Sequence, residues 1–124
     1  MKKIVMLLCI ALSACDSGAL WTDGTYEVHW VDTGGNVTLA RLINDGQDTI
    51  GRVDAEVVAV GSDDRYIVAK QRELGTKVIS YFYVDRAKDS SYLNMDEITQ
   101  GPFSEERYLE LKAELKLPEF SREF

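Results

Sequence analysis

Hydrophobic and polar residues alternate along much of the chain after residue 24. In TYEVHWV, residues 25–31, apolar side chains occupy every second position, and VTLARLI, residues 37–43, repeats this pattern. Alternation with a period of two predicts strands with one buried face. The intervening DTGGN, residues 32–36, has the glycines of a tight turn, so the two segments are predicted to form a hairpin.

Further strands are predicted where β-branched and aromatic residues recur between turn-forming segments. The predicted strands are 49–60, with a break expected near 51–54, then 65–70 and 77–85. Turns are predicted at 44–48, 61–64 and 71–76, a polar loop at 86–91, and a short strand or a loop at 92–100. The segment KVISYFYVD, 77–85, is apolar or aromatic on both faces, which is typical of a central strand.

The C-terminal segment changes to a helical period. Ser104 is a favourable N-cap, and the glutamates that follow it suit the positive end of a helix. Phe103 and Tyr108 have the spacing of a hydrophobic staple, and Pro118 ends the helix. One apolar face is formed by Tyr108, Leu111 and Leu115. We therefore predict an α+β domain, with a curled, meander-like antiparallel sheet of about five to seven strands and one C-terminal helix packed on it.

The first 14 residues have the organisation of a signal peptide. Lys2 and Lys3 precede nine apolar residues, IVMLLCIAL at 4–12. A bilayer-spanning helix needs roughly 20 such residues, so this segment is too short to be one. The predicted organisation is a signal peptide at 1–14, a lipidated tether at 15–24 and a single α+β domain at 25–124.

Leu-Ser-Ala-Cys, which ends at Cys15, resembles the lipobox of bacterial lipoproteins. The resemblance implies that Cys15 becomes the first mature residue, with a thioether to diacylglycerol and acylation of its amine, because the thiolate is the nucleophile required. The alternative is a core or disulfide cysteine, but the only other cysteine, Cys9, lies in the signal peptide. Asp16 resembles the signal that retains lipoproteins in the inner membrane, which predicts the periplasmic face of that membrane. A polar linker residue is the alternative interpretation of Asp16.

Composition and charge narrow the range of partners. Hydrophobic content of 45% with 28% charged residues is typical of a soluble globular domain. Removal of Lys2 and Lys3 reduces the 14 basic residues to 12 against 21 acidic residues, which changes the net charge from −7 to −9. This charge argues against binding to nucleic acid and favours a cationic protein partner, although it also keeps a small domain soluble.

No residue stands out as catalytic or metal-binding. His29 is the only histidine and lies on a predicted strand, where a packed or surface imidazole is the simpler interpretation. One histidine without a free thiol makes a zinc site unexpected, and we predict no cofactor. The acidic pairs Asp45/Asp48, Asp63/Asp64 and Asp96/Glu97 lack calcium-loop spacing and suit turns. The aromatic residues are expected in the core, with a binding platform as the alternative: Trp21, Trp30, Tyr66, Tyr81, Phe82 and Tyr83.

Three segments together resemble a family of small bacterial lipoproteins called DUF3997, to which no activity is assigned. They are VDAEVVAVGSDDRYIVAKQ at 53–71, YFYVDRAK at 81–88 and QGPFSEERYLELKAELKLPEF at 100–120. The matching positions are Asp63 or Asp64, Tyr66, Ile67, Ala69, Lys70 and Gln71, followed by Gly101, Pro102, Phe103, Ser104, Glu105 and Glu106. The resemblance implies the fold and a location in the cell envelope.

These observations predict a non-catalytic lipoprotein of the bacterial envelope that binds another protein, as an immunity protein or an inhibitor does. One alternative is a structural accessory subunit of an envelope complex. A cell-wall hydrolase is the other alternative, and it would require convergent carboxylates in a cleft.

Overall fold

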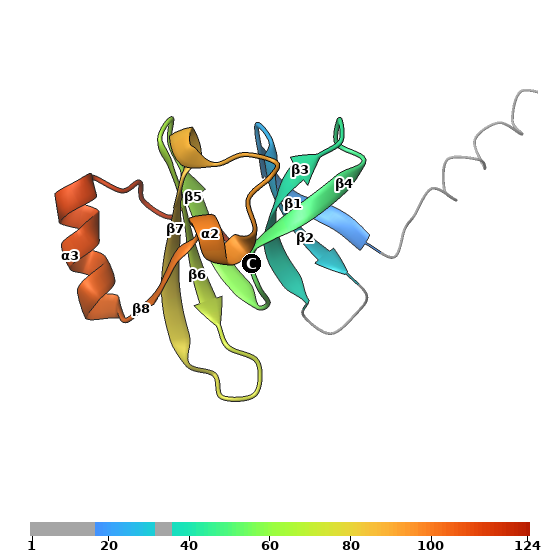
Figure 1. Ribbon diagram of the computed structural model, residues 1–124. Coiled ribbons are helices and arrows are strands. Elements are labelled where there is room, and N and C mark those ends of the chain that lie inside the picture. Colours follow the sequence, from blue (N-terminus) through green and yellow to red (C-terminus); the bar gives the residue numbers. More distant parts are fainter. Residues whose placement is uncertain (1–16, 32–35) are drawn as a thin grey trace, which may run out of the picture.

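The computed structural model describes residues 17–31 and 36–124, in which the strands form two antiparallel sheets (Figure 1). The strand order is β1-β2-β3-β4 in the first sheet and β8-β7-β6-β5-β9 in the second. The first sheet contains β1 (Ser17–Asp23), β2 (Tyr26–Val31), β3 (Val37–Ile43) and β4 (Asp48–Val53). The second contains β5 (Val57–Ser62), β6 (Tyr66–Arg72), β7 (Ile79–Asp85), β8 (Gln100–Phe103) and β9 (Arg122–Glu123). The helices are the 3-10 helix η2 (Arg86–Lys88), α2 (Met95–Ile98) and α3 (Glu105–Leu115).

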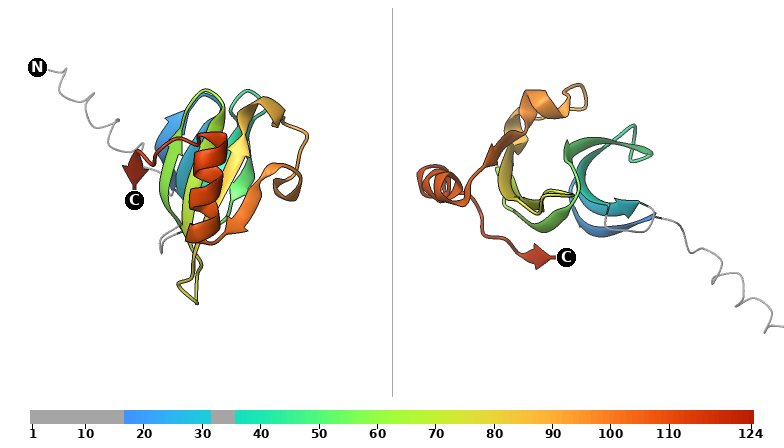
Figure 2. Two further views of the ribbon diagram at one scale, coloured as in Figure 1. Left: turned by 90° about the vertical axis from the view of Figure 1, so that its left-hand side faces the viewer. Right: turned by 90° about the horizontal axis from the view of Figure 1, so that it is seen from below.

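The predicted α+β class, with antiparallel strands and a C-terminal helix, is confirmed. The strands predicted at 25–31, 37–43, 65–70 and 77–85 correspond to β2, β3, β6 and β7. The strands are divided between two curved sheets rather than joined in one (Figure 2). The division occurs at residues 54–56, between β4 and β5, and so overlaps the end of the break expected near 51–54. Arg52 and Val53 are still buried in β4, whereas Asp54 is exposed, so the chain leaves the first sheet only there.

The strand β1 replaces most of the predicted tether at 15–24. It pairs with β2 over its whole length, and its Leu20 and Trp21 pack against the core. Asp23-Gly24 lies at the turn between the two strands, and Gly24 has a φ of 62°. Asp-Gly between apolar segments is a strong hairpin pattern, because glycine adopts positive φ without steric cost. Within the described residues, the folded domain therefore begins at Ser17.

The second sheet has an apolar layer on each face, which explains why apolar and polar residues do not simply alternate along its strands. The core between the sheets contains Tyr26, Val28, Leu39 and Val53 from the first sheet, with Val57, Val60, Ile67, Ala69 and Val84 from the second. A second cluster lies between the other face of the second sheet and α3, and it contains Tyr66, Val68, Tyr81, Tyr108, Leu111 and Leu117. A sheet covered on both faces has apolar residues at consecutive positions, which confirms β7 as a central strand.

The helix α3 starts and packs as predicted. The Ser104 hydroxyl accepts a hydrogen bond from the backbone N–H of Arg107 at 3.2 Å. The helix lies across the outer face of the second sheet (Figure 2), where the Tyr108 ring stacks on Tyr81 with 4.7 Å between ring centroids. Lys116 adopts a left-handed conformation, with φ of 60°, and ends the helix two residues before Pro118. Within the described residues, none of the helices combines the length and apolar character needed to cross a bilayer.

Gly61 permits the C-terminal segment to pack against β5. The N–H of Ser121 donates to the carbonyl of Val60 at 2.9 Å, and a Cβ at position 61 would overlap the carbonyl oxygen of Glu119. We expect Gly61→Ala to lower the free energy of unfolding by about 1–3 kcal/mol, as other overpacked sites do. The measurement is urea denaturation of the full chain in a mild detergent. Gly51→Ala is the matched control, because its Cβ would meet only the flexible end of Met95. An equal effect of the two substitutions would contradict this explanation.

Candidate functional site

The predicted lipidation and sorting residues, Cys15 and Asp16, lie outside the described residues. The other residues considered for chemistry lie in separate parts of the molecule. His29 is on β2, where its Nδ1 lies 2.9 Å from a carboxylate oxygen of Glu27 and its Nε2 lies 3.3 Å from the hydroxyl of Thr38. The imidazole is therefore held within the first sheet by its strand neighbours.

The acidic pairs are in turns and at a helix end. Asp63 accepts hydrogen bonds from the backbone N–H groups of Arg65 and Tyr66, at 2.8 and 2.7 Å, and so stabilises the turn before β6. Asp48 accepts a hydrogen bond from Asn44 in the β3–β4 turn. Over residues 17–31 and 36–124, no group of three or more metal-ligating side chains is positioned to hold an ion.

The aromatic residues lie in the two cores and at their edges. Tyr66 and Tyr81 are buried against α3, and Tyr83 stacks on Phe103 at the side of the same cluster. Trp21, Trp30 and Phe82 pack against the core between the sheets. The prediction that these rings build the core is consistent with these positions.

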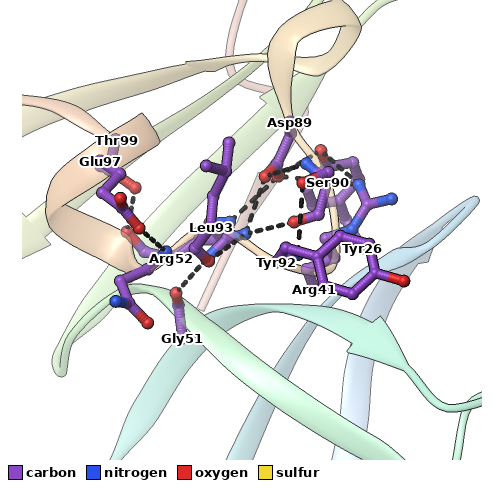
Figure 3. Close-up of polar contacts among 11 residues, drawn as sticks. Tyr26, Arg41, Gly51, Arg52, Asp89, Ser90, Tyr92, Leu93, Glu97 and Thr99 are labelled. Atoms are coloured by element: carbon purple, nitrogen blue, oxygen red, sulfur yellow. Dashed lines mark hydrogen bonds and ion pairs between the residues drawn. The ribbon is translucent and has the colours of Figure 1, made fainter.

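A buried ion pair connects the two sheets through the segment that follows β7 (Figure 3). Arg52 on β4 donates to both carboxylate oxygens of Asp89, at 3.0 and 2.7 Å, and both side chains are 0% exposed. The same guanidinium donates to the backbone carbonyls of Gly51, Ser90 and Leu93 at 2.9–3.1 Å. A buried guanidinium is tolerated when its donors are satisfied, so this arginine fixes the path of residues 89–93.

Two further side chains complete this network. The hydroxyl of Tyr26 donates to Asp89 at 2.7 Å and accepts a hydrogen bond from Arg41 at 3.1 Å. Burial, together with the neighbouring Asp89 carboxylate, raises the pKa of Tyr26 to about 12. Burial alone would raise the pKa of Asp89, but the hydrogen bonds from Arg52 and Tyr26 outweigh it and lower that pKa. The Asp89 carboxylate is therefore held in its charged form.

The segment that contains Asp89 is fixed at two more positions. Arg86 donates to Asp23 on β1 at 2.9 Å, which attaches the segment to the far edge of the first sheet. Asp85 accepts two hydrogen bonds from Arg65, at 2.9 and 2.8 Å, and these hydrogen bonds lower its pKa despite partial burial. The predicted polar loop at 86–91 is thus an ordered connection between the sheets. The sequence indicated its polarity, but it did not show which arginine lies opposite each aspartate.

The outward face of α3 is acidic and exposed. It carries Glu105, Glu106, Leu109, Glu110, Ala113 and Glu114, which we call the acidic helix face. The helix α3 stands on the outside of the second sheet (Figures 1 and 2), and all six of these residues are exposed. Leu109 is 53% exposed beside these carboxylates, of which Glu110 forms an ion pair with the exposed Arg107. An exposed apolar side chain flanked by an excess of negative charge suits contact with a surface of opposite charge.

Most arginines of the described residues form ion pairs within the domain. Every arginine except Arg122 forms an ion pair with a carboxylate of the described residues: Arg41, Arg52, Arg65, Arg72, Arg86 and Arg107. The guanidinium of Arg122 instead lies over the ring of Phe124. The excess negative charge therefore remains on exposed side chains, including those of the acidic helix face.

The fold defines a class of protein: a small two-sheet domain that contains a buried arginine–aspartate network and has an acidic helix on its outer face. Residues 23–121 match the family described as a protein of unknown function, DUF3997, and the chain belongs to that family. The match confirms the resemblance and extends it to the N-terminal strands. Comparisons with curated proteins and with solved structures gave no significant match.

Proposed function

We propose that this protein is a lipid-anchored component of the bacterial cell envelope that binds a cationic protein, in the manner of an immunity protein or inhibitor. The acidic helix face is the observation on which the binding role rests. It lies opposite the packed side of α3, so a partner can cover it without disturbing the core. The absence of a catalytic role is part of the proposal.

The anchor in this proposal is the lipid on Cys15, and Asp16 directs the protein to the periplasmic face of the inner membrane. Two or three acyl chains anchor a protein stably, whereas one chain is marginal. Only one residue separates Cys15 from β1, so the domain would stand close to the headgroups. Because α3 lies on the opposite side of the domain from β1, a partner would meet the acidic helix face on the side away from the anchor (Figure 1).

We expect the triple variant Glu106→Gln, Glu110→Gln, Glu114→Gln to bind its cationic partner about tenfold more weakly at low salt. These glutamates are spaced four residues apart along one exposed stripe of α3, so the substitutions remove charge without touching the core. The measurement is capture from envelope extracts with the immobilised full chain, followed by titration of the captured protein at two salt concentrations.

The matched control is Asp45→Asn, Asp54→Asn, Asp64→Asn. It removes the same charge from exposed positions in turns and in the β4–β5 connection, away from α3. Capture of one basic protein by the unaltered chain and the control, but not by the triple variant, supports the proposal. Equal capture by all three chains, or capture of nothing, counts against it.

A second candidate, an accessory subunit of an envelope complex, is favoured by the β6–β7 hairpin, which projects from the body (Figure 1). Its end exposes Leu74, Val78 and Ile79, at 53%, 55% and 39%. The turn is internally hydrogen-bonded, with the N–H of Glu73 donating to the carbonyl of Val78 at 2.8 Å. Exposed apolar residues on an ordered hairpin are typical of a protein contact.

A further inference from the structure

A pocket of ≈ 370 Å³ opens beside the end of β7, between η2, β8 and the last turn of α3. Its volume is within the range of about 300–1,000 Å³ that is common for small-molecule sites. Its polar lining consists of Arg65, Tyr66, Tyr83, Asp85, Lys88 and Gln100. This pocket is separate from the acidic helix face, although both involve α3.

The one carboxylate in the lining is already fully engaged. Asp85 Oδ1 accepts from Arg65 Nε at 2.9 Å and from the backbone N–H of Ala87 at 3.0 Å, and Oδ2 accepts from a terminal nitrogen of Arg65 at 2.8 Å. Asp85 is also largely buried, with its side chain 10% exposed. It therefore positions Arg65 and leaves little capacity for a ligand cation.

The groups left free in the pocket are mostly hydrogen-bond donors. Among the described residues, the Lys88 ammonium has no hydrogen-bond or ion-pair partner, and the guanidinium of Arg65 keeps N–H groups that Asp85 does not occupy. The phenol hydroxyls of Tyr66 and Tyr83 and the amide of Gln100 also have no partner in that part of the chain. The lining thus carries a net positive charge in a chain with net charge −7.

The remaining walls are aromatic and apolar, and they are held rigidly. The rings of Tyr66 and Tyr83 meet edge to face, with 5.7 Å between centroids, and Phe103 stacks behind Tyr83 at 6.1 Å. Ile98 and Leu115 complete the lining. Tyrosine rings with free hydroxyls combine an apolar surface with polar groups, which suits the faces and hydroxyls of a sugar ring.

We propose that this pocket binds a sugar acid, a monosaccharide that carries one carboxylate. The carboxylate is placed on the Lys88 ammonium and the free N–H groups of Arg65, and the sugar ring lies against the parts of Tyr66 and Tyr83 that Arg65 and Phe103 leave uncovered. A phosphate is a poorer fit, because phosphate sites collect several backbone N–H groups or cations. The proposal concerns a different surface from the protein-binding role, so the two can fail independently.

The test compares two sugars that differ in the carboxylate. N-acetylmuramic acid has the ring and acetamide of N-acetylglucosamine together with a lactyl carboxylate. We expect the full chain in a mild detergent to bind the acid at least tenfold more tightly, with NMR shift changes at Lys88 and Gln100. Acetate, as a carboxylate without the ring, is expected to bind more weakly than the acid. Equal binding of the two sugars overturns the proposal, as does acetate binding as tightly as the sugar acid.

Two variants assign the interaction to this pocket. Lys88→Gln is expected to lower the affinity for N-acetylmuramic acid about tenfold and leave that for N-acetylglucosamine unchanged. Lys77→Gln, at the end of the β6–β7 hairpin, removes the same charge elsewhere and is expected to change neither affinity. Tyr83→Phe keeps the ring stacked on Phe103 but removes the hydroxyl, and it is expected to weaken the binding of both sugars. Unchanged affinity in Lys88→Gln would overturn the assignment.

Discussion

Replacing Asp89 by asparagine is expected to lower the free energy of unfolding by about 3–5 kcal/mol. The substitution keeps the size of the side chain but leaves the guanidinium of Arg52, which is 0% exposed, without a compensating charge. It also removes the carboxylate that accepts the hydrogen bond from Tyr26. The measurement is urea denaturation of the full chain in a mild detergent, compared with the unaltered chain under the same conditions.

The matched control is Glu110→Gln, the same carboxylate-to-amide change in an exposed pair with Arg107. Exposed ion pairs contribute about 0–1 kcal/mol to stability, so this control is expected to change the free energy of unfolding very little. The double variant Arg52→Met, Asp89→Leu is expected to lose less unfolding free energy than Asp89→Asn, because it removes the fully buried guanidinium together with its carboxylate. If Asp89→Asn lowered the free energy of unfolding no more than the control does, the network would not hold the two sheets together.

The same network predicts how stability depends on pH. Because the folded pKa of Asp89 is lowered, its contribution is present above the pKa of an unfolded aspartate and is lost as the pH falls through the folded value. The pKa of Tyr26 is raised to about 12, so its contribution is present below the pKa of an unfolded tyrosine and is lost as the pH rises toward 12. The two groups therefore limit stability at opposite ends of the pH range.

Local patterns predicted the strands and α3 well, because alternation, turn residues and capping act over a few positions. The Ser104 cap and the β3 boundaries follow directly from such patterns. The pattern in 49–60 indicated a break near 51–54, but no local pattern shows that the strands on either side of a break belong to different sheets. The strand β1 was missed although Asp23-Gly24 marks its hairpin, because its short apolar stretch follows the expected lipid attachment site.

The candidate sites were less predictable, since they depend on residues far apart in the chain. Arg52 and Asp89 are 37 positions apart, and Arg52 lies on a strand beside apolar residues whereas Asp89 lies in a polar loop. A sequence pattern cannot distinguish an arginine on a surface from one that is fully buried. The sequence pattern placed the first two glutamates at the N-terminus of α3, but it did not indicate the acidic helix face, whose exposure depends on Tyr108 and Leu111 packing on the second sheet.

Replacing Cys15 by serine is expected to abolish lipid attachment. A serine hydroxyl is not ionised near neutral pH and cannot replace the thiolate that accepts the glyceryl group. The measurement is metabolic labelling with an alkyne fatty acid, followed by determination of the intact mass of the chain. Labelling is more decisive than fractionation alone, because an uncleaved signal peptide could also keep the protein at the membrane.

Cys9→Ser makes the same substitution within the nine apolar residues of the signal peptide and is the matched control. It is expected to retain full labelling, because Cys9 does not follow Leu-Ser-Ala. Labelled Cys15→Ser chain, or unlabelled chain from the unaltered sequence, would refute the anchor. The acidic helix face would then face solvent without a fixed distance from a membrane, and a cationic partner would have to be sought among soluble proteins. Asp16→Ser, in a labelled chain, separates attachment from sorting, since only the membrane of residence is expected to change.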